Sequence, residues 1–81
     1  MKYSKFIKYI IKKKINLFDA QSRIIHSKLF NNNNNIQNGG SNKQIIKNII
    51  KNLETPYLKI FLDSVYDNNA IRIKYILNNF I

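Results

Sequence analysis

A chain of 81 residues with 14 Lys and Arg, four Asp and Glu, one His and no Cys can form at most one small domain. The missing cysteines exclude disulfides and thiolate metal sites, and a single histidine does not make a zinc site. The formal net charge of +10 favours a polyanionic partner, which means nucleic acid or an anionic membrane surface.

Three residue types dominate the composition, because 16 Ile, 14 Asn and 12 Lys account for 42 of the 81 residues. All three use A- and T-rich codons, so an AT-rich genome can explain part of the Lys and Asn content. It does not explain the deficit of acids, since Asp and Glu codons can also be A- or T-rich and Glu54 is the only Glu. We therefore expect the charge to be functional. We also expect so small a core to be completed by packing in a larger assembly.

Residues 1–30 are predicted to form a basic amphipathic helical segment. At about 100° per residue, the apolar residues lie opposite Lys5, Lys8, Lys12 and Lys13. The predicted apolar face consists of Tyr3, Phe6, Ile7, Ile10, Ile11, Ile15, Leu17 and Phe18. Asp19 can cap a further helix, in which Ile24, Ile25 and Leu29 continue an apolar face. The pattern fits one helix over residues 3–30 as well as two helices broken near residues 16–19.

The first eighteen residues are amphipathic and contain no acid, which suits a mitochondrial import signal, although they also contain no Arg. No segment approaches the roughly 20 apolar residues that span a bilayer. Residues 31–42 form a low-complexity linker with five consecutive Asn and a Gly-Gly pair. Because this linker has almost no apolar surface to bury, we expect it to be a flexible loop.

Residues 43–81 are predicted to form a helical hairpin or three-helix unit. Ser41 and Gln44 match a capping box at the start of its first helix. Thr55 is the expected N-cap of the next helix, with Pro56 at the first helical position, and residues 67–69 have the composition of a turn. Two apolar stripes follow the helical period: Ile45, Ile46, Ile49, Ile50 and Leu53 in the first helix, and Leu58, Phe61, Leu62 and Val65 in the second.

The last segment, residues 70–81, fits two kinds of secondary structure. Ile73, Ile76, Leu77 and Phe80 have helical spacing, whereas Ile71, Ile73 and Tyr75 alternate with basic residues as in a strand. The helical neighbours favour the helix. The predicted fold class is therefore all-α, with three to four short helices in two halves joined by the Asn-rich loop.

Nothing in the chain has the pattern of a catalytic centre. Asp63 and Asp67 are spaced i, i+4, but a carboxylate pair on a helix face without a metal is usually only solvated. The Gly39-Gly40 pair lacks the Lys-Ser/Thr and the preceding strand of a phosphate loop. His26 has no catalytic partner in the pattern. We expect no enzymatic activity, no cofactor and no metal.

The basic residues are the more informative set, and Lys outnumbers Arg six to one, which favours diffuse phosphate contacts over bidentate reading of bases. The predicted RNA-binding residues are Lys5, Lys8, Lys12, Lys13, Arg23, Lys28, Lys43, Lys47 and Lys51. Tyr3, Phe6, Tyr9 and Phe30 could stack on unpaired bases, although Phe6 fits a core position better. RNA binding is expected to be salt-sensitive and lost when Lys5, Lys8, Lys12 and Lys13 become Gln.

Residues 22–58 carry a series of short motifs. Ser22-Arg23-Ile24 opens a stretch that ends in Lys28-Leu29-Phe30, and a polar loop with Asn-Gly-Gly-Ser follows. A basic segment, Lys43-Gln44-Ile45-Ile46-Lys47, leads to Leu53 and Pro56-Tyr57. This series resembles a family of small-subunit proteins of the mitochondrial ribosome, the thirty-third of that subunit in the systematic naming. The chain departs from the family in a loop without Pro or Arg and in an apolar C-terminal segment instead of an Arg/Lys-Gly-rich tail.

The resemblance implies a structural ribosomal protein in the mitochondrial matrix that binds ribosomal RNA and neighbouring ribosomal proteins and has no catalytic role. Its Lys and Arg faces would contact RNA phosphates, and its Ile, Leu and Phe stripes would contact proteins. The main alternative is an accessory or assembly subunit of a mitochondrial inner-membrane complex, with the lysines on anionic headgroups. Two further alternatives are a cleaved presequence followed by a helical hairpin, and a chain without a fixed fold.

Overall fold

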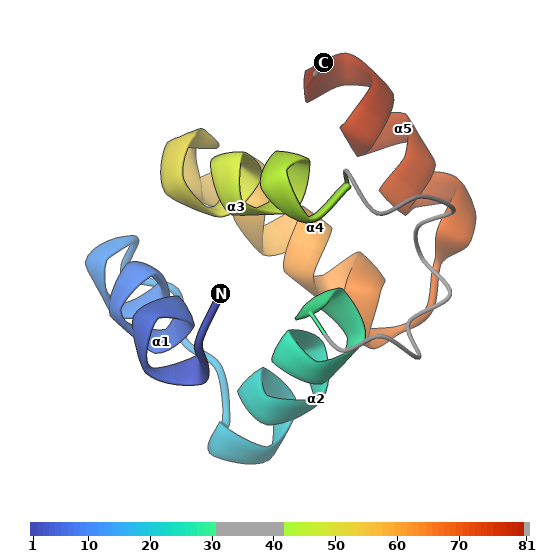
Figure 1. Ribbon diagram of the computed structural model, residues 1–81. Coiled ribbons are helices and arrows are strands. Elements are labelled where there is room, and N and C mark those ends of the chain that lie inside the picture. The colour runs from blue at the N-terminus through green and yellow to red at the C-terminus, as the bar shows by residue number, and fades with distance from the viewer. Residues whose placement is uncertain (31–41, 81) are drawn as a thin grey trace.

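A computed structural model of the protein describes residues 1–30 and 42–80. Five helices make up these two ranges. They are α1 (Tyr3–Lys12), α2 (Asp19–Phe30), α3 (Asn42–Asn52), α4 (Thr55–Tyr66) and α5 (Ala70–Phe80) (Figure 1). No strand occurs in these two ranges, so the predicted all-α class is confirmed. The predicted number of three to four helices was wrong, because residues 1–30 already hold two helices and the second half holds three.

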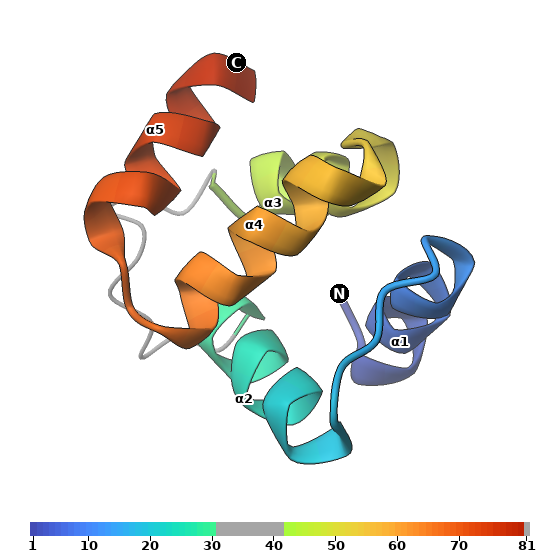
Figure 2. The ribbon, with the colours of Figure 1, turned by 180° about the vertical axis from the view of Figure 1, so that it is seen from behind.

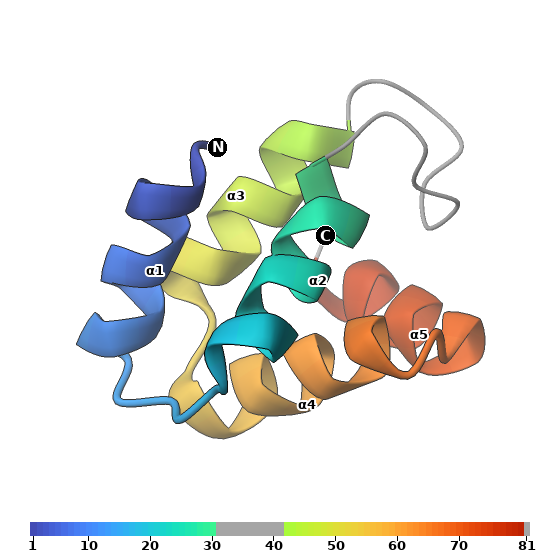
Figure 3. The same cartoon turned by 90° about the horizontal axis from the view of Figure 1, so that it is seen from below.

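The helices pack around one apolar core that joins both halves of the chain. Helix α4 contacts α2 and α5, and it crosses the middle of the molecule in Figure 2. Helix α1 contacts α2 and α3, which lie beside it in Figure 3. The core residues are Phe6, Ile10, Ile15, Ile25, Leu29, Phe30, Ile46, Ile49, Ile50, Leu58, Phe61, Leu62, Val65 and Ile73. The stripes predicted for residues 45–53 and 58–65 are confirmed, since all their members are buried or pack against this core.

Helices α1 and α4 both end in a Schellman motif whose left-handed residue is not glycine. Lys14 has φ 59°, and the amides of Lys14 and Ile15 donate to the carbonyls of Ile11 and Ile10 at 2.9 and 3.2 Å. The same arrangement follows α4, where Asn68 has φ 58°. The turn predicted at residues 67–69 is therefore confirmed. The break that divides residues 3–30 into two helices begins at residue 13, earlier than the expected break near residues 16–19.

The left-handed backbone of Lys14 predicts a substitution that stabilises the protein. A side chain with Cβ costs about 1 kcal/mol in this conformation, so we expect Lys14→Gly to raise the free energy of unfolding by up to about that amount. The exposed Lys8, inside α1, provides the matched control, and Lys8→Gly should lower the free energy of unfolding by about 1 kcal/mol. Urea denaturation of both variants should show changes of opposite sign in the free energy of unfolding. A loss of stability in Lys14→Gly would contradict the strain at this position.

Three apolar residues predicted to lie on buried faces are exposed instead. Ile11 is 68% exposed, Phe18 83% and Ile24 41%. Because α1 ends at Lys12, the helical period that placed Phe18 on its apolar face does not extend that far. Ile11 lies one residue beyond the buried Ile10 and is turned away from the core by the helical rotation of about 100°.

The structure corrects the predicted N-terminus of one helix, α4. Glu54, not Thr55, is the N-cap of α4, and the Thr55 hydroxyl donates to the carbonyl of Lys13 at 3.1 Å. Ser41 lies outside the described residues, and so does the predicted linker apart from Asn42, the first residue of α3. The helix predicted over residues 70–81 is confirmed over Ala70–Phe80 as α5, the alternative strand is wrong there, and Ile81 lies outside the described residues. None of the described helices combines the length and apolarity needed to cross a bilayer.

Candidate nucleic-acid interface

A basic cleft opens between α1 and α3. It has a volume of about 730 Å³ and is lined by Met1, Lys2, Lys5, Tyr9, Gln44, Lys47 and Lys51. Both walls have the spacing i, i+3, i+7, with the N-cap residue 2 and residues 5 and 9 of α1 on one side and residues 44, 47 and 51 of α3 on the other. The cleft therefore exists only because the core brings together two helices from opposite sides of residues 31–41.

The charge of the cleft is uncompensated by the part of the chain that the structure describes. No carboxylate is among the residues that line it. The ammonium groups of Lys2, Lys5, Lys47 and Lys51 form neither an ion pair nor a hydrogen bond with the residues of 1–30 and 42–80. Four positive charges that converge without an anion create a potential that attracts a polyanion.

Hydrogen bonds and ring packing hold α1 against α2 and thereby set the position of the α1 wall. The Tyr3 hydroxyl lies 2.8 Å from Ser22 Oγ and donates to Asp19 Oδ1 at 3.3 Å. His26 Nε2–H donates to the carbonyl oxygen of Met1 at 2.7 Å. The His26 ring also packs against the rings of Tyr3, Phe6 and Phe30, with centroids 5.2–5.4 Å apart. His26 thus anchors the N-terminus beside the cleft.

Three of the predicted RNA-binding residues make contacts within the protein. The Lys13 ammonium donates to the Leu53 carbonyl at 3.0 Å and ties the end of α1 to the end of α3. The Lys28 ammonium donates at 2.9 Å to the Tyr66 carbonyl and to Asn68 Oδ1. These two lysines therefore connect elements that are 38 or more residues apart in sequence.

The third of these residues, Arg23, lies beside a carboxylate. Arg23 Nε donates to Asp19 Oδ2 at 2.9 Å, and the guanidinium lies 5.2 Å from the centroid of the Tyr3 ring. The hydrogen bond to Asp19 and the negative charge of that carboxylate raise the pKa of Arg23. Asp19 neutralises part of the positive charge here, so Arg23 offers less attraction to phosphate than the lysines of the cleft.

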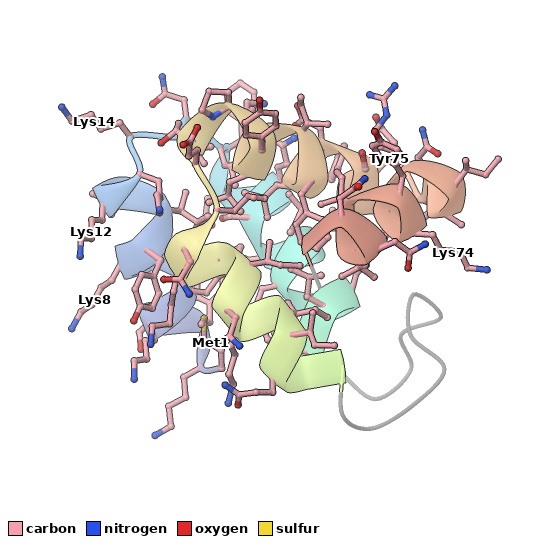
Figure 4. All side chains as sticks on the ribbon, turned by 90° about the horizontal axis from the view of Figure 1, so that it is seen from above. Met1, Lys8, Lys12, Lys14, Lys74 and Tyr75 are labelled. Atoms are coloured by element: carbon pink, nitrogen blue, oxygen red, sulfur yellow. The ribbon has the colours of Figure 1, made fainter. Side chains whose placement is uncertain are left out.

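The other predicted RNA-binding residues are distributed around the cleft. Lys5, Lys47 and Lys51 line it. Lys8 and Lys12 are exposed on α1, and Figure 4 shows them projecting away from the body of the protein. They extend the row of Lys5 at i+3 and i+7, so they continue the basic surface outward. The side chain of Lys43 lies outside the described residues.

Tyr9 is the aromatic side chain in the cleft, where it is half-buried among lysines. Phe6 and Phe30 are buried in the core, with exposed fractions of 0% and 8%, and are not available to bases. Tyr3 is half-buried and engaged with Ser22, Asp19 and Arg23. Of the four aromatic residues considered for base stacking, the structure thus leaves Tyr9 next to uncompensated cations.

The sequence pattern missed Lys2 and Gln44 as members of the cleft. A signal was present, because Lys2, Lys5 and Tyr9 repeat the spacing of Gln44, Lys47 and Lys51. In the described ranges, no group of three or more His, Asp or Glu residues has the arrangement of a metal site.

Comparisons of this chain with protein-family models, with curated proteins and with solved structures found no match.

Proposed function

We propose that this protein is a structural, non-catalytic subunit of a ribonucleoprotein that binds single-stranded RNA phosphates in the α1–α3 cleft. The observation that carries the proposal is the convergence of Lys2, Lys5, Lys47 and Lys51 from two helices without a carboxylate in the cleft. Each phosphate that binds there releases condensed counterions, which is the main source of affinity for lysine-rich proteins. Tyr9 adds a ring on which an unpaired base can stack.

The resemblance of residues 22–58 supports the small subunit of the mitochondrial ribosome as the assembly. In that setting the cleft would contact ribosomal RNA, and exposed apolar side chains would contact neighbouring ribosomal proteins. The amphipathic, acid-free N-terminal segment supports the mitochondrial matrix as the location. Lysine rather than arginine at the cleft supports a role in phosphate contact without base-specific reading.

The inner-membrane alternative has one observation in its favour. Ile11 and Phe18 are 68% and 83% exposed, close in sequence to the exposed Lys12 and Lys14, as in a segment that lies on an anionic lipid surface. On the apolar face of α1, Phe6 and Ile10 are buried in the core and have no surface to offer to lipid, and Ile7 is half-buried against that core. We therefore favour RNA.

Binding to RNA at several salt concentrations tests the proposal. We expect the affinity for a fluorescent single-stranded RNA of about 12 nucleotides to fall linearly with salt on a double-logarithmic plot, with a slope of about −0.7 per phosphate contact. The double variant Lys5→Gln/Lys51→Gln removes two contacts, so it should reduce the slope by about 1.4 and weaken binding about tenfold. Fluorescence anisotropy measures both quantities.

The control variant Lys14→Gln/Lys74→Gln removes the same charge from outside the cleft. This variant should weaken RNA binding less than threefold, because it reduces only the long-range electrostatic attraction between the protein and the RNA. Equal losses in the two double variants would show that only net charge matters and would refute the cleft. Tight binding to anionic vesicles without binding to RNA would favour the membrane alternative.

Sedimentation of the tagged protein from its own cells tests the proposed assembly. Co-migration with a small ribosomal subunit, lost after RNase treatment, is the expected result. Migration with an RNase-resistant membrane complex would instead support the accessory-subunit alternative.

A further inference from the structure

An apolar groove lies between α4 and α5, two helices that pack against each other. It has a volume of about 660 Å³ and includes Leu53 at the end of α3, Tyr57 and Ile60 of α4, and Tyr75 and Ile76 of α5. Helix α5 packs mainly on α4, and in the part of the chain that the structure describes only Ile73 of this helix is fully buried. The groove is thus an apolar side of α5 that the fold leaves uncovered.

The side chains of the groove are of the types that dominate protein interfaces. Tyr57 is 57% exposed, Ile60 42% and Tyr75 68%, and Figure 4 shows Tyr75 projecting outward from α5. Tyrosine and arginine are enriched among the residues that contribute most to binding, especially where apolar neighbours exclude water. Exposed Tyr57, Ile60 and Tyr75 on one groove therefore favour a protein partner.

Arg72 gives the groove its charge. Its side chain lines the groove, which has no acid in its lining, and makes no hydrogen bond or ion pair with any described residue. A guanidinium presents parallel N–H donors that match the two oxygens of a carboxylate. The groove is therefore complementary to an apolar surface that carries a carboxylate at one edge.

We infer that this groove binds an amphipathic helix of a partner protein, with apolar side chains between α4 and α5 and an Asp or Glu on Arg72. A helix fits because the walls are helices, and the described ranges have no strand whose edge an extended peptide could join. The inference gives a location and a chemistry to the protein contacts of the proposed function. It rests on that part of the proposal and does not require RNA in the cleft.

A second copy of this chain is a poor binding partner for the groove. Two molecules of formal charge +10 repel each other. Of the four acids that a copy could place on Arg72, Asp19 is already paired with Arg23 and Asp63 with Lys59. The complementary partner is therefore a different protein with an acidic amphipathic helix.

Selection from a peptide library tests the inference with the full-length protein. The library displays helical peptides of about 16 residues with apolar side chains at i, i+3, i+4 and i+7 and with Glu, Lys, Gln or Ala at the flanking positions. We expect Glu to be enriched at one flank of the selected peptides. Fluorescence anisotropy should then show that Arg72→Glu weakens binding about fivefold or more. A peptide in which the selected Glu is replaced by Lys should regain binding to the Arg72→Glu variant of the protein.

The matched control is Lys74→Glu, which makes the same charge change on α5 outside the groove and should alter the affinity less than twofold. Three results would overturn the inference. They are equal losses of peptide affinity in both variants, no enrichment of Glu in the selected peptides, and peptide-induced NMR shifts confined to the basic cleft. Sedimentation that shows a dimer dissociated by Tyr75→Ala would assign the groove to a second copy and also overturn it. RNA binding is measured separately, so failure of the cleft and failure of the groove are distinguishable.

Discussion

Phe6→Ala is expected to lower the free energy of unfolding by about 3–5 kcal/mol, because it leaves a cavity in a core that cannot collapse around it. Phe6 is completely buried and its ring lies 5.4 Å from that of His26 and 6.5 Å from that of Phe30. Small domains are stable by only about 5–15 kcal/mol, so the variant should lose a large share of its stability. Urea denaturation followed by far-UV circular dichroism measures the loss.

Phe18→Ala is the matched control, because the sequence pattern placed both phenylalanines on the same apolar face. Phe18 is 83% exposed, and its replacement should change the free energy of unfolding by less than about 0.5 kcal/mol. Similar losses in the two variants would mean that Phe18 is also buried in solution. That result would contradict the end of α1 at Lys12.

Removal of residues 1–18 is expected to abolish cooperative folding. The deletion takes Phe6, Ile10 and Ile15 out of the core and also removes the α1 wall of the basic cleft. Far-UV circular dichroism during heating should show no cooperative transition for residues 19–81, and affinity for RNA should fall to that of an unfolded basic chain. A separate peptide of residues 1–18, added in excess, should restore part of the helical signal, because binding of its apolar face to the folded form of residues 19–81 shifts the folding equilibrium toward that form.

A stable, cooperatively unfolding fragment of residues 19–81 would show that α1 is dispensable for the fold. The same experiment bears on the expected import signal. A segment that supplies three core residues and half of a cleft can direct import only if it is retained afterwards. N-terminal sequencing of the endogenous protein should therefore find the chain beginning before Phe6.

The periodic parts of the fold could be predicted from the sequence because they depend on local spacing. Ile46, Ile49 and Ile50 recur at i, i+3 and i+4 and are completely buried as expected. Thr55 could not be placed in the same way, because its hydroxyl hydrogen-bonds to a carbonyl 42 residues away. The left-handed backbone of Lys14 could not be predicted either, because Gly or Asn is the residue that usually indicates such a helix end.

The candidate site was predictable only in its charge. Lys5, Lys47 and Lys51 were expected to bind phosphates, and they line the cleft. Lys13 and Lys28 have the same side chain, but tertiary partners occupy their ammonium groups. Nothing within a helical turn of either lysine indicates such a partner. The shared cleft of α1 and α3 was also beyond local reasoning, because it depends on how the core aligns two separate helices.

The basic cleft and the apolar groove are two separate surfaces of a body of 28 × 24 × 21 Å, and both reach the end of α3, where Lys51 lines the cleft and Leu53 lines the groove. A molecule that binds an RNA strand on one of these surfaces and a protein helix on the other is bivalent. Once one surface is bound within an assembly, the partner of the second surface is present at an effective concentration on the order of millimolar, so two weak contacts combine into one long-lived attachment. Avidity of this kind would allow so small a chain to hold its place in an assembly without a tight interface on either surface.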